Sequence, residues 1–299
     1  MSITTNAAIG GRIAALRTAR GLSQAELAAA LGLSHKQVVS NLEKGVRSLK
    51  ATELVSLAKL FHVSPLTILG LQSFDTPGFV LWRQTPDDKT RREVEAAFLN
   101  RCRDYAFLER LAGINPRSLP FRFECHPSST SFETAAGWAS TVRKALGLGE
   151  TPAVGLLSDL ENRYGVKIFV TPLPGGSGAT YRGDLGDAIL LNAGEPTGRR
   201  AFSLAHELFH LLTWDSTIST KARNQSTECA RLEKLAENFA AALLLPREAL
   251  EERLPPGNPA TWKVFQWVDL ARTFGVTVPA LVWRLVNLAR LAPDDAQRI

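Results

Sequence analysis

His206 and His210 are four residues apart, and Glu207 directly follows the first of them. On a helix with about 3.6 residues per turn, this spacing places both imidazoles on one face, as binding of a single metal ion requires. Glu207 lies one step round the helix, where its carboxylate can activate a water and shuttle the proton. Apolar residues flank the motif, so these polar groups face an interior in which they must be satisfied. The pattern predicts a zinc site with Glu207 as the catalytic base.

The third protein ligand of this site is not fixed by the motif itself. A catalytic zinc usually has three protein ligands and keeps a fourth position for water. A longer form of this motif, with a third histidine further along the chain, is absent, because Ser216 stands at the position of that histidine. Glu233 and Glu237 lie four apart on one face of an apolar helix, where a carboxylate without a cation would be costly. Asp215 is a weaker third candidate, so spacing alone leaves the ligand open.

Residues 8–70 predict a bundle of short helices separated by glycine turns. Ser23 and Glu26 form a capping box at the start of a second helix, residues 24–31. Ser34 is predicted to cap a third helix, residues 35–44. Two more helices are expected near residues 53–61 and from Pro65 onward. Leu27, Leu31, Val38 and Leu42 are expected in the core of this bundle.

The second and third of these helices have the layout that places a recognition helix in the major groove of DNA. Polar side chains early on the third helix are of types that read base edges, and those on either side of it are better placed for phosphates. The predicted DNA contacts are Gln24, His35, Lys36, Gln37, Ser40, Asn41, Lys44 and Arg47. Residues 1–72 hold eight Lys and Arg against three Glu and no Asp, a net charge of +5 that suits a polyanionic partner. The alternative is a bundle whose polar face is only solvated or binds a protein.

The remaining sequence predicts a linker followed by a mixed helical and β region. Periodicity is lost over residues 74–86, with a turn at residues 75–78, before a long connecting helix at residues 89–111. Further elements are expected as helices at 131–146 and 152–164, strands at 166–170 and 188–192 around a glycine-rich turn, and a helical tail at 262–291. Tyr181, placed in the loop before the second strand, is either a stabiliser of an oxyanion across the cleft or a packing residue.

Composition excludes several classes of protein. The 299 residues suffice for two domains of about 100 to 200 residues each. The apolar fraction of 45% and charged fraction of 21% are typical of globular chains, which excludes general disorder. No apolar run approaches the roughly 20 residues of a membrane span, and the first residues lack the features of a secretion signal. The three cysteines, Cys102, Cys125 and Cys229, are scattered, which predicts reduced thiols in a cytoplasmic protein.

Two stretches of the chain resemble known families. Residues 11–69 resemble the Xre/Cro-repressor helix-turn-helix family, most clearly at residues 22–28 and 39–45. Residues 200–210 and 233–246 resemble the ImmA/IrrE metallopeptidase family, and that resemblance extends over about residues 120–290. It implies that Glu233 completes the zinc site with His206 and His210. Glu237 stands where that family usually has asparagine, which leaves it as a group beside the ligands or a competing ligand.

The resemblances imply a mainly α chain with a small β-sheet, an α+β fold of two domains. A five-helix, lambda-repressor-like bundle is expected at residues 1–72 and a linker with a connecting helix at 73–120. A zincin-like metallopeptidase domain is expected at residues 121–260 and a helical C-terminal subdomain at 261–299. One Zn²⁺ per chain is expected, although Mn²⁺ or Fe²⁺ would accept the same ligands more weakly.

The implied function is that of a bacterial regulator that binds a double-stranded DNA operator as a homodimer. Its zinc domain would cleave a repressor or other regulatory protein, or the chain itself, after stress or DNA damage. One alternative is a transcription factor that no longer cuts and uses the peptidase fold to sense a ligand or partner. A further alternative is an antitoxin-like autorepressor.

Overall fold

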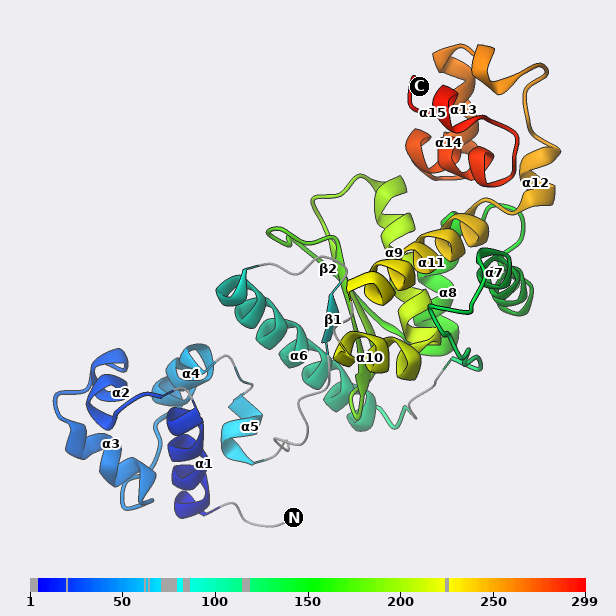
Figure 1. The fold of residues 1–299 in the computed structure, drawn as a ribbon. Coiled ribbons are helices and arrows are strands. Elements are labelled where there is room, and N and C mark those ends of the chain that lie inside the picture. The colour runs from blue at the N-terminus through cyan, green and yellow to red at the C-terminus, as the bar shows by residue number, and fades with distance from the viewer. Residues whose placement is uncertain are drawn as a thin grey trace. The chain divides into compact units, whose positions relative to one another are not determined.

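The computed structural model describes residues 5–19, 21–61, 63, 65–70, 80–82, 87–114, 119–223 and 226–299. The turn predicted at residues 75–78 lies outside these residues. The chain divides into two compact units, one made of residues 1–77 and 88–113 and the other of residues 78–87 and 114–299 (Figure 1). The domain boundaries inferred from the sequence remain predictions. Among the described residues, no helix has the length and apolar character needed to cross a membrane.

The N-terminal unit contains six helices among its described residues. Their bounds are α1 Asn6–Ala19, α2 Gln24–Ala30, α3 Lys36–Glu43, α4 Ala51–Leu60, α5 Pro65–Leu69 and α6 Asp88–Leu111. The capping box at the start of α2 is confirmed, since the Ser23 hydroxyl accepts from the Glu26 amide and the Glu26 carboxylate accepts from the Ser23 amide. Glu43 accepts hydrogen bonds from Arg17 at 2.6 Å and from Gln24 at 2.7 Å, which joins α1, α2 and α3.

Two local predictions in this unit are wrong. The N-cap of α3 is His35 in an extended conformation, without a side-chain cap bond, rather than Ser34. Val39 is fully buried in the core, whereas Val38 is only partly buried. The spacing to the buried Leu42 suits either valine, and the packing of α3 against its neighbours selects Val39. Leu27 and Leu42 are buried in this core as predicted, and Leu31 packs against it.

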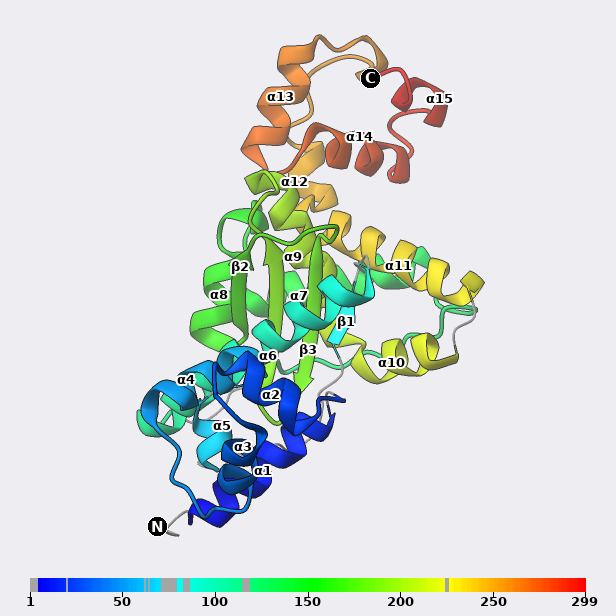
Figure 2. The same ribbon diagram turned by 90° about the vertical axis from the view of Figure 1, so that its left-hand side faces the viewer.

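The second unit contains a four-stranded mixed sheet in the order β1-β3-β4-β2 (Figure 2). Its strands are β1 Val80–Trp82, β2 Lys167–Thr171, β3 Gly178–Gly183 and β4 Gly186–Asn192. β2 and β4 are parallel, whereas the pairs β1/β3 and β3/β4 are antiparallel. β1 and β3 were not predicted from the sequence, and Tyr181, predicted in a loop, lies in β3. β3 was not predicted because it lacks the alternation of a half-buried strand: its first four residues are all buried, and glycines stand at both of its ends.

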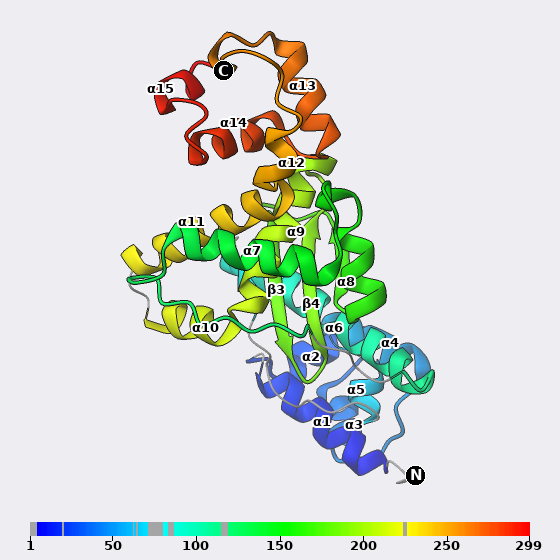
Figure 3. The ribbon, with the colours of Figure 1, turned by 90° about the vertical axis from the view of Figure 1, so that its right-hand side faces the viewer.

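Helices of the second unit cover one another and the sheet, as Figure 3 shows for α7, α9 and α11. Their bounds are α7 Phe132–Leu146, α8 Leu156–Tyr164, α9 Thr197–Leu212, α10 Trp214–Arg223, α11 Ser226–Leu244, α12 Arg247–Glu251, α13 Val264–Thr273, α14 Val278–Asn287 and α15 Pro293–Ala296. Short 3₁₀ segments span Pro152–Val154 and Pro259–Thr261. The predicted fold class, mainly helical with a small sheet, is confirmed.

α9 is the central helix of this unit. It packs against β3 and β4 on one side and against α11 on another, and every residue from Ser203 to Leu212 is buried. Arg182 pairs with Asp187 across the β3/β4 hairpin at 2.5 Å and also donates to the Leu211 carbonyl at 2.7 Å, near the end of α9. The buried Arg284 of α14 donates to the Leu245 carbonyl at the end of α11. These bonds hold both helix ends in place.

The difference between the two predicted caps gives a stability test. Ser23→Ala removes the side-chain acceptor at the start of α2 and is expected to lower the free energy of unfolding by about 1 kcal/mol. Ser34→Ala is the matched control, and it should cost less than about 0.5 kcal/mol because His35 is the N-cap of α3. Denaturant unfolding followed by circular dichroism compares the two variants. A larger loss for Ser34→Ala would contradict the assignment.

Candidate metal centre

The ligand atoms of three side chains converge in the second unit. His206 and His210 project from α9, and Glu233 projects from the adjacent α11. The two histidine Nε2 atoms are 3.2 Å apart, and Glu233 Oε2 lies 3.0 Å from the first and 3.6 Å from the second. Both histidines are buried, and their candidate ligand atoms all lie within 4.8 Å of that of Glu233. The structure thus brings together the three residues proposed as metal ligands.

These distances fit a small divalent cation. An ion with tetrahedral bonds of about 2.0–2.1 Å would hold its ligand atoms about 3.3 Å apart, close to the three distances observed. Two imidazoles and one carboxylate are also the ligand set of catalytic zinc sites that keep one position open. The residues present therefore fit a divalent metal with three protein ligands.

Glu207 is wholly buried, and its two carboxylate oxygens differ in their contacts. Oε2 accepts a 2.5 Å hydrogen bond from the Thr180 hydroxyl of β3, which fixes the side chain against the sheet. Oε1 is buried and has no hydrogen-bond partner among the described residues. A Cβ at Gly178 would come within 3.0 Å of Oε1, so β3 carries a glycine where this carboxylate approaches the strand. Glu207 thus has one anchored oxygen and one oxygen available to accept a proton.

Burial and neighbouring charges act differently on the two glutamates. Burial raises the pKa of the Glu207 carboxyl, against the opposing effects of His210 and the hydrogen bond from Thr180. Burial also acts to raise the pKa of Glu233, but His210, the hydrogen bonds from both histidines and the charge of Lys221 hold that pKa well below its ordinary range. Glu233 is therefore held as a carboxylate suited to a cation, and Glu207 is tuned toward proton uptake.

α10 supplies contacts that the sequence analysis missed. Lys221 lies 3.1 Å from Glu233 Oε1 and donates at 3.0 Å to the carbonyl oxygen of Trp82 in β1. Thr217 Oγ1 lies 3.5 Å from His210 Nδ1, on the side of the ring away from the cluster. Such outer contacts orient the ligating groups. No spacing signal marks Lys221 or Thr217, because α10 joins the site only through the fold.

Three further candidates lie outside the cluster. Glu237 and Asp215 are exposed, and neither belongs to the metal-binding group found among the described residues. Tyr181 is buried, with its hydroxyl over Gly183, and its neighbour Thr180 faces Glu207. Because successive side chains of a strand point to opposite faces, Tyr181 lies on the face of the sheet away from Glu207. The role of Tyr181 in stabilising an oxyanion stays a prediction.

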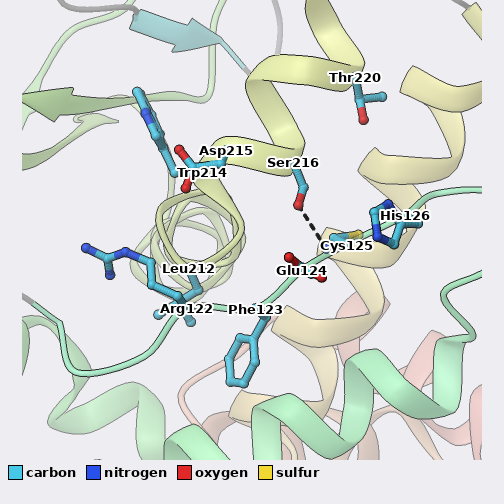
Figure 4. Close-up of a pocket in the computed structure, with 10 residues that line it drawn as sticks. All are labelled: Arg122, Phe123, Glu124, Cys125, His126, Leu212, Trp214, Asp215, Ser216 and Thr220. Atoms are coloured by element: carbon cyan, nitrogen blue, oxygen red, sulfur yellow. Dashed lines mark hydrogen bonds between the residues drawn. The ribbon is translucent and has the colours of Figure 1, made fainter.

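A cavity of about 640 Å³ lies beside α10, between that helix and the extended segment 122–126 (Figure 4). The Cys125 amide donates to the Ser216 hydroxyl across it at 3.0 Å. Cys125 and His126 both line this cavity, but burial raises the pKa of the Cys125 thiol to about 11. A thiol with that pKa stays protonated near neutral pH, so the pair is not a nucleophile and base.

The residues predicted to contact DNA lie around α3. His35, Lys36, Gln37 and Lys44 are exposed, whereas Ser40 and Asn41 are partly buried. The Gln37 amide donates to Asn41 Oδ1 at 3.1 Å. Two other candidates are engaged within the unit: Gln24 donates to Glu43, and Arg47 forms a paired hydrogen bond with Glu53 at 2.7 and 2.9 Å. The roles of all eight residues in DNA binding remain predictions.

Two family models match the chain. Residues 13–68 match the helix-turn-helix family, and residues 161–286 match the IrrE N-terminal-like domain, which includes all three ligands of the candidate site. These matches confirm the predicted fusion of an Xre-type helix-turn-helix domain with an ImmA/IrrE-like domain. The chain thus carries a DNA-binding domain, and its second domain is of a peptidase family.

A solved structure shows a distant likeness to part of the chain. The chain is similar to a Mycobacterium tuberculosis transcriptional regulator, with a TM-score of 0.37 and 21% sequence identity. The match covers 51% of this chain and 46% of the other, so this chain spans less than half of that protein. No curated protein matches the chain.

Removal of a single ligand tests the metal centre. Glu233→Ala removes one of the three proposed ligands. We therefore expect it to weaken binding of a divalent ion by more than the roughly 10–100-fold loss of affinity that is typical when only a residue in contact with a ligand is changed. Glu237→Ala, one turn further along the same helix, is the matched control and should bind the ion as the wild type does. Elemental analysis and competition with a chromophoric chelator measure both. Equal loss in the two variants would argue against Glu233 as the ligand.

Proposed function

We propose that this chain, which joins a helix-turn-helix DNA-binding domain to an IrrE N-terminal-like domain, is a transcriptional regulator and a zinc-dependent peptidase. Its substrate would be a regulatory protein, such as a repressor, in a stress or DNA-damage response. The observation that carries the proposal is the convergence of the ligand atoms of His206, His210 and Glu233, together with the buried Glu207, whose Oε1 has no hydrogen-bond partner among the described residues. A merely structural metal site would not need that free carboxylate oxygen.

The chemistry of the site follows from its residues. A divalent ion held by His206, His210 and Glu233 supplies Lewis-acid chemistry for a carbonyl group and for water. Glu207 is the general base, and it takes a proton from the attacking water at Oε1 while Thr180 keeps Oε2 in place. The same carboxyl then gives the proton to the departing amine, which a raised pKa favours. Water and peptide are thus converted to a carboxylic acid and an amine.

The DNA-binding role rests on the exposed face at the start of α3. His35, Lys36 and Gln37 are all exposed at the N-terminal end of this helix, which is the end that reads base edges in helix-turn-helix proteins. Lysine and glutamine are suited to guanine and adenine respectively. We infer that the chain reads an operator with these residues and binds two half-sites as a homodimer.

A second candidate function, ligand sensing without cleavage, is favoured by a cavity of about 760 Å³ along α11. Glu237, one turn from Glu233, lines this cavity together with apolar side chains that include Phe202 and Trp283. Its size suits a small molecule. A regulator could read such a molecule through α11, which also carries the candidate metal ligand.

A cleavage assay separates the two functions. The zinc-loaded chain is incubated with purified regulatory proteins encoded beside it and with the chain itself, and fragments are identified by mass spectrometry. Glu207→Gln should lower the cleavage rate by about 10²–10⁴-fold while zinc stays bound, because only the base is lost. Glu252→Gln, an exposed glutamate with 71% of its side chain accessible, is the control and should cut like the wild type. Stoichiometric zinc without any cleavage would favour the sensor.

DNA recognition is tested on an operator selected from a random pool. The double variant Lys36→Ala/Gln37→Ala is expected to lose about 1–3 kcal/mol of discrimination for each base contact removed. Lys59→Ala removes an exposed positive charge on α4 and should change affinity little. Fluorescence anisotropy with specific and scrambled DNA measures both. Unchanged operator affinity and specificity in the double variant would exclude α3 as the recognition helix.

A further inference from the structure

β1 is a three-residue strand, Val80–Trp82, that belongs to neither matched family region. It pairs antiparallel with β3 and is the outer strand on that side of the sheet. Without β1, the strand that bonds the proposed catalytic base would itself be the sheet edge. The position of β1 therefore bears on how a substrate could reach the site.

The β3 edge is the place where an extended peptide would meet Glu207. Extended peptides bind to proteins by adding a strand to a sheet edge, with backbone hydrogen bonds along the edge strand. Thr180 of β3 bonds Glu207 directly, whereas the opposite edge strand, β2, is separated from β3 by β4. A peptide paired with β3 would run past the proposed base and metal ligands.

β1 occupies this edge of β3, with one of its residues directly opposite Thr180. Leu81 is the partner of Thr180 in the ladder, and directly opposed residues share a face, so Leu81 lies on the Glu207 side of the sheet. Its side chain is buried in the core that includes α9. The next residue, Trp82, accepts a hydrogen bond from Lys221 through its carbonyl, and Lys221 also contacts Glu233. Two polar contacts thus connect the β1 backbone to a proposed metal ligand.

We propose that β1 is an intramolecular occupant of the substrate-binding edge, and that the site accepts an extended peptide with an apolar side chain in the place of Leu81. This inference rests on the proposed peptidase function. A substrate strand and β1 cannot pair with the same edge of β3 at once, so β1 must withdraw before a substrate binds. A ladder of three residues has few hydrogen bonds, which makes withdrawal feasible.

The chain itself links this edge to the DNA-binding unit. β1 lies in sequence between α5 and α6, and both of these helices belong to the N-terminal unit. β1 is thus one point at which the chain connects the peptidase-like unit with the DNA-binding unit.

Peptide binding tests the proposal independently of cleavage. The probe is a fluorescein-labelled Gly-Ser-Val-Leu-Trp-Ser-Gly peptide, added to the zinc-loaded full chain carrying Glu207→Gln so that it is not consumed. Leu81→Asp places a charge at a buried position of β1 and should lower the apparent Kd for the peptide at least about tenfold, since the apparent Kd varies inversely with the fraction of open sites. Leu108→Asp, the same change at an exposed position of α6, should leave the Kd unchanged.

A disulfide provides the converse test and does not depend on the tolerance for Leu81→Asp. Trp82 and Ala179 are direct partners in the ladder, at a spacing that disulfides accept. The double variant Trp82→Cys/Ala179→Cys should bind the peptide when reduced and lose at least about nine tenths of that binding when oxidised and locked. Equal peptide binding by the oxidised and reduced forms, or by Leu81→Asp and its parent, would overturn the proposal.

Cleavage is followed in parallel in chains that retain Glu207. If β1 variants change peptide binding but nothing is cut, the inference about β1 holds and the peptidase function fails. If substrates are cut but neither binding nor cutting responds to Leu81→Asp or to the disulfide, the peptidase function holds and the inference about β1 is wrong.

Discussion

The second unit depends on the burial of three ionisable side chains on one helix. His206, Glu207 and His210 have exposed fractions of 0%, 0% and 1%. Burial of such groups is costly unless partners compensate for the lost water. A helix that places them between a sheet and another helix must therefore be supplied with hydrogen bonds and opposite charge by elements distant in sequence.

Each neighbouring element supplies one part of that compensation. β3 provides the Thr180 hydroxyl to Glu207 and a glycine where the carboxylate needs room. α11 brings the Glu233 carboxylate to the two imidazoles, and α10 brings Lys221 to the outer oxygen of that carboxylate. A cation would complete the arrangement, because three ligand atoms lie at the distances it requires and the pKa of Glu233 is held low. Binding of the metal and stability of this unit are coupled in such a site.

Sequence patterns predicted the parts of the fold and site that local spacing encodes. The capping box of α2, the helical positions of His206 and His210 and the strands β2 and β4 follow from short-range periodicity. The third ligand, Glu233, required a family resemblance, because the spacing on α11 favours Glu237 equally. Thr180, Lys221 and β1 could not be predicted, since their roles depend on strand pairing and helix packing between residues far apart in sequence. Val38 shows the same limit locally, because spacing to Leu42 suits Val38 and Val39 alike and only the packing of α3 against its neighbours decides that Val39 is buried.

The contacts of Lys221 show why assembly of the site and access to it are not independent. Its ammonium group bonds the Trp82 carbonyl and the Glu233 carboxylate at nearly equal distances, 3.0 and 3.1 Å. If β1 leaves, Lys221 loses one acceptor but keeps the charged one, so the contact with Glu233 remains while the edge of β3 becomes free. A substrate carbonyl in the place of that of Trp82 would restore the lost hydrogen bond. Lys221 can therefore donate a hydrogen bond to β1 in the closed state and to a bound peptide after β1 has left. Withdrawal of β1 then costs less electrostatic free energy than the loss of an isolated buried contact.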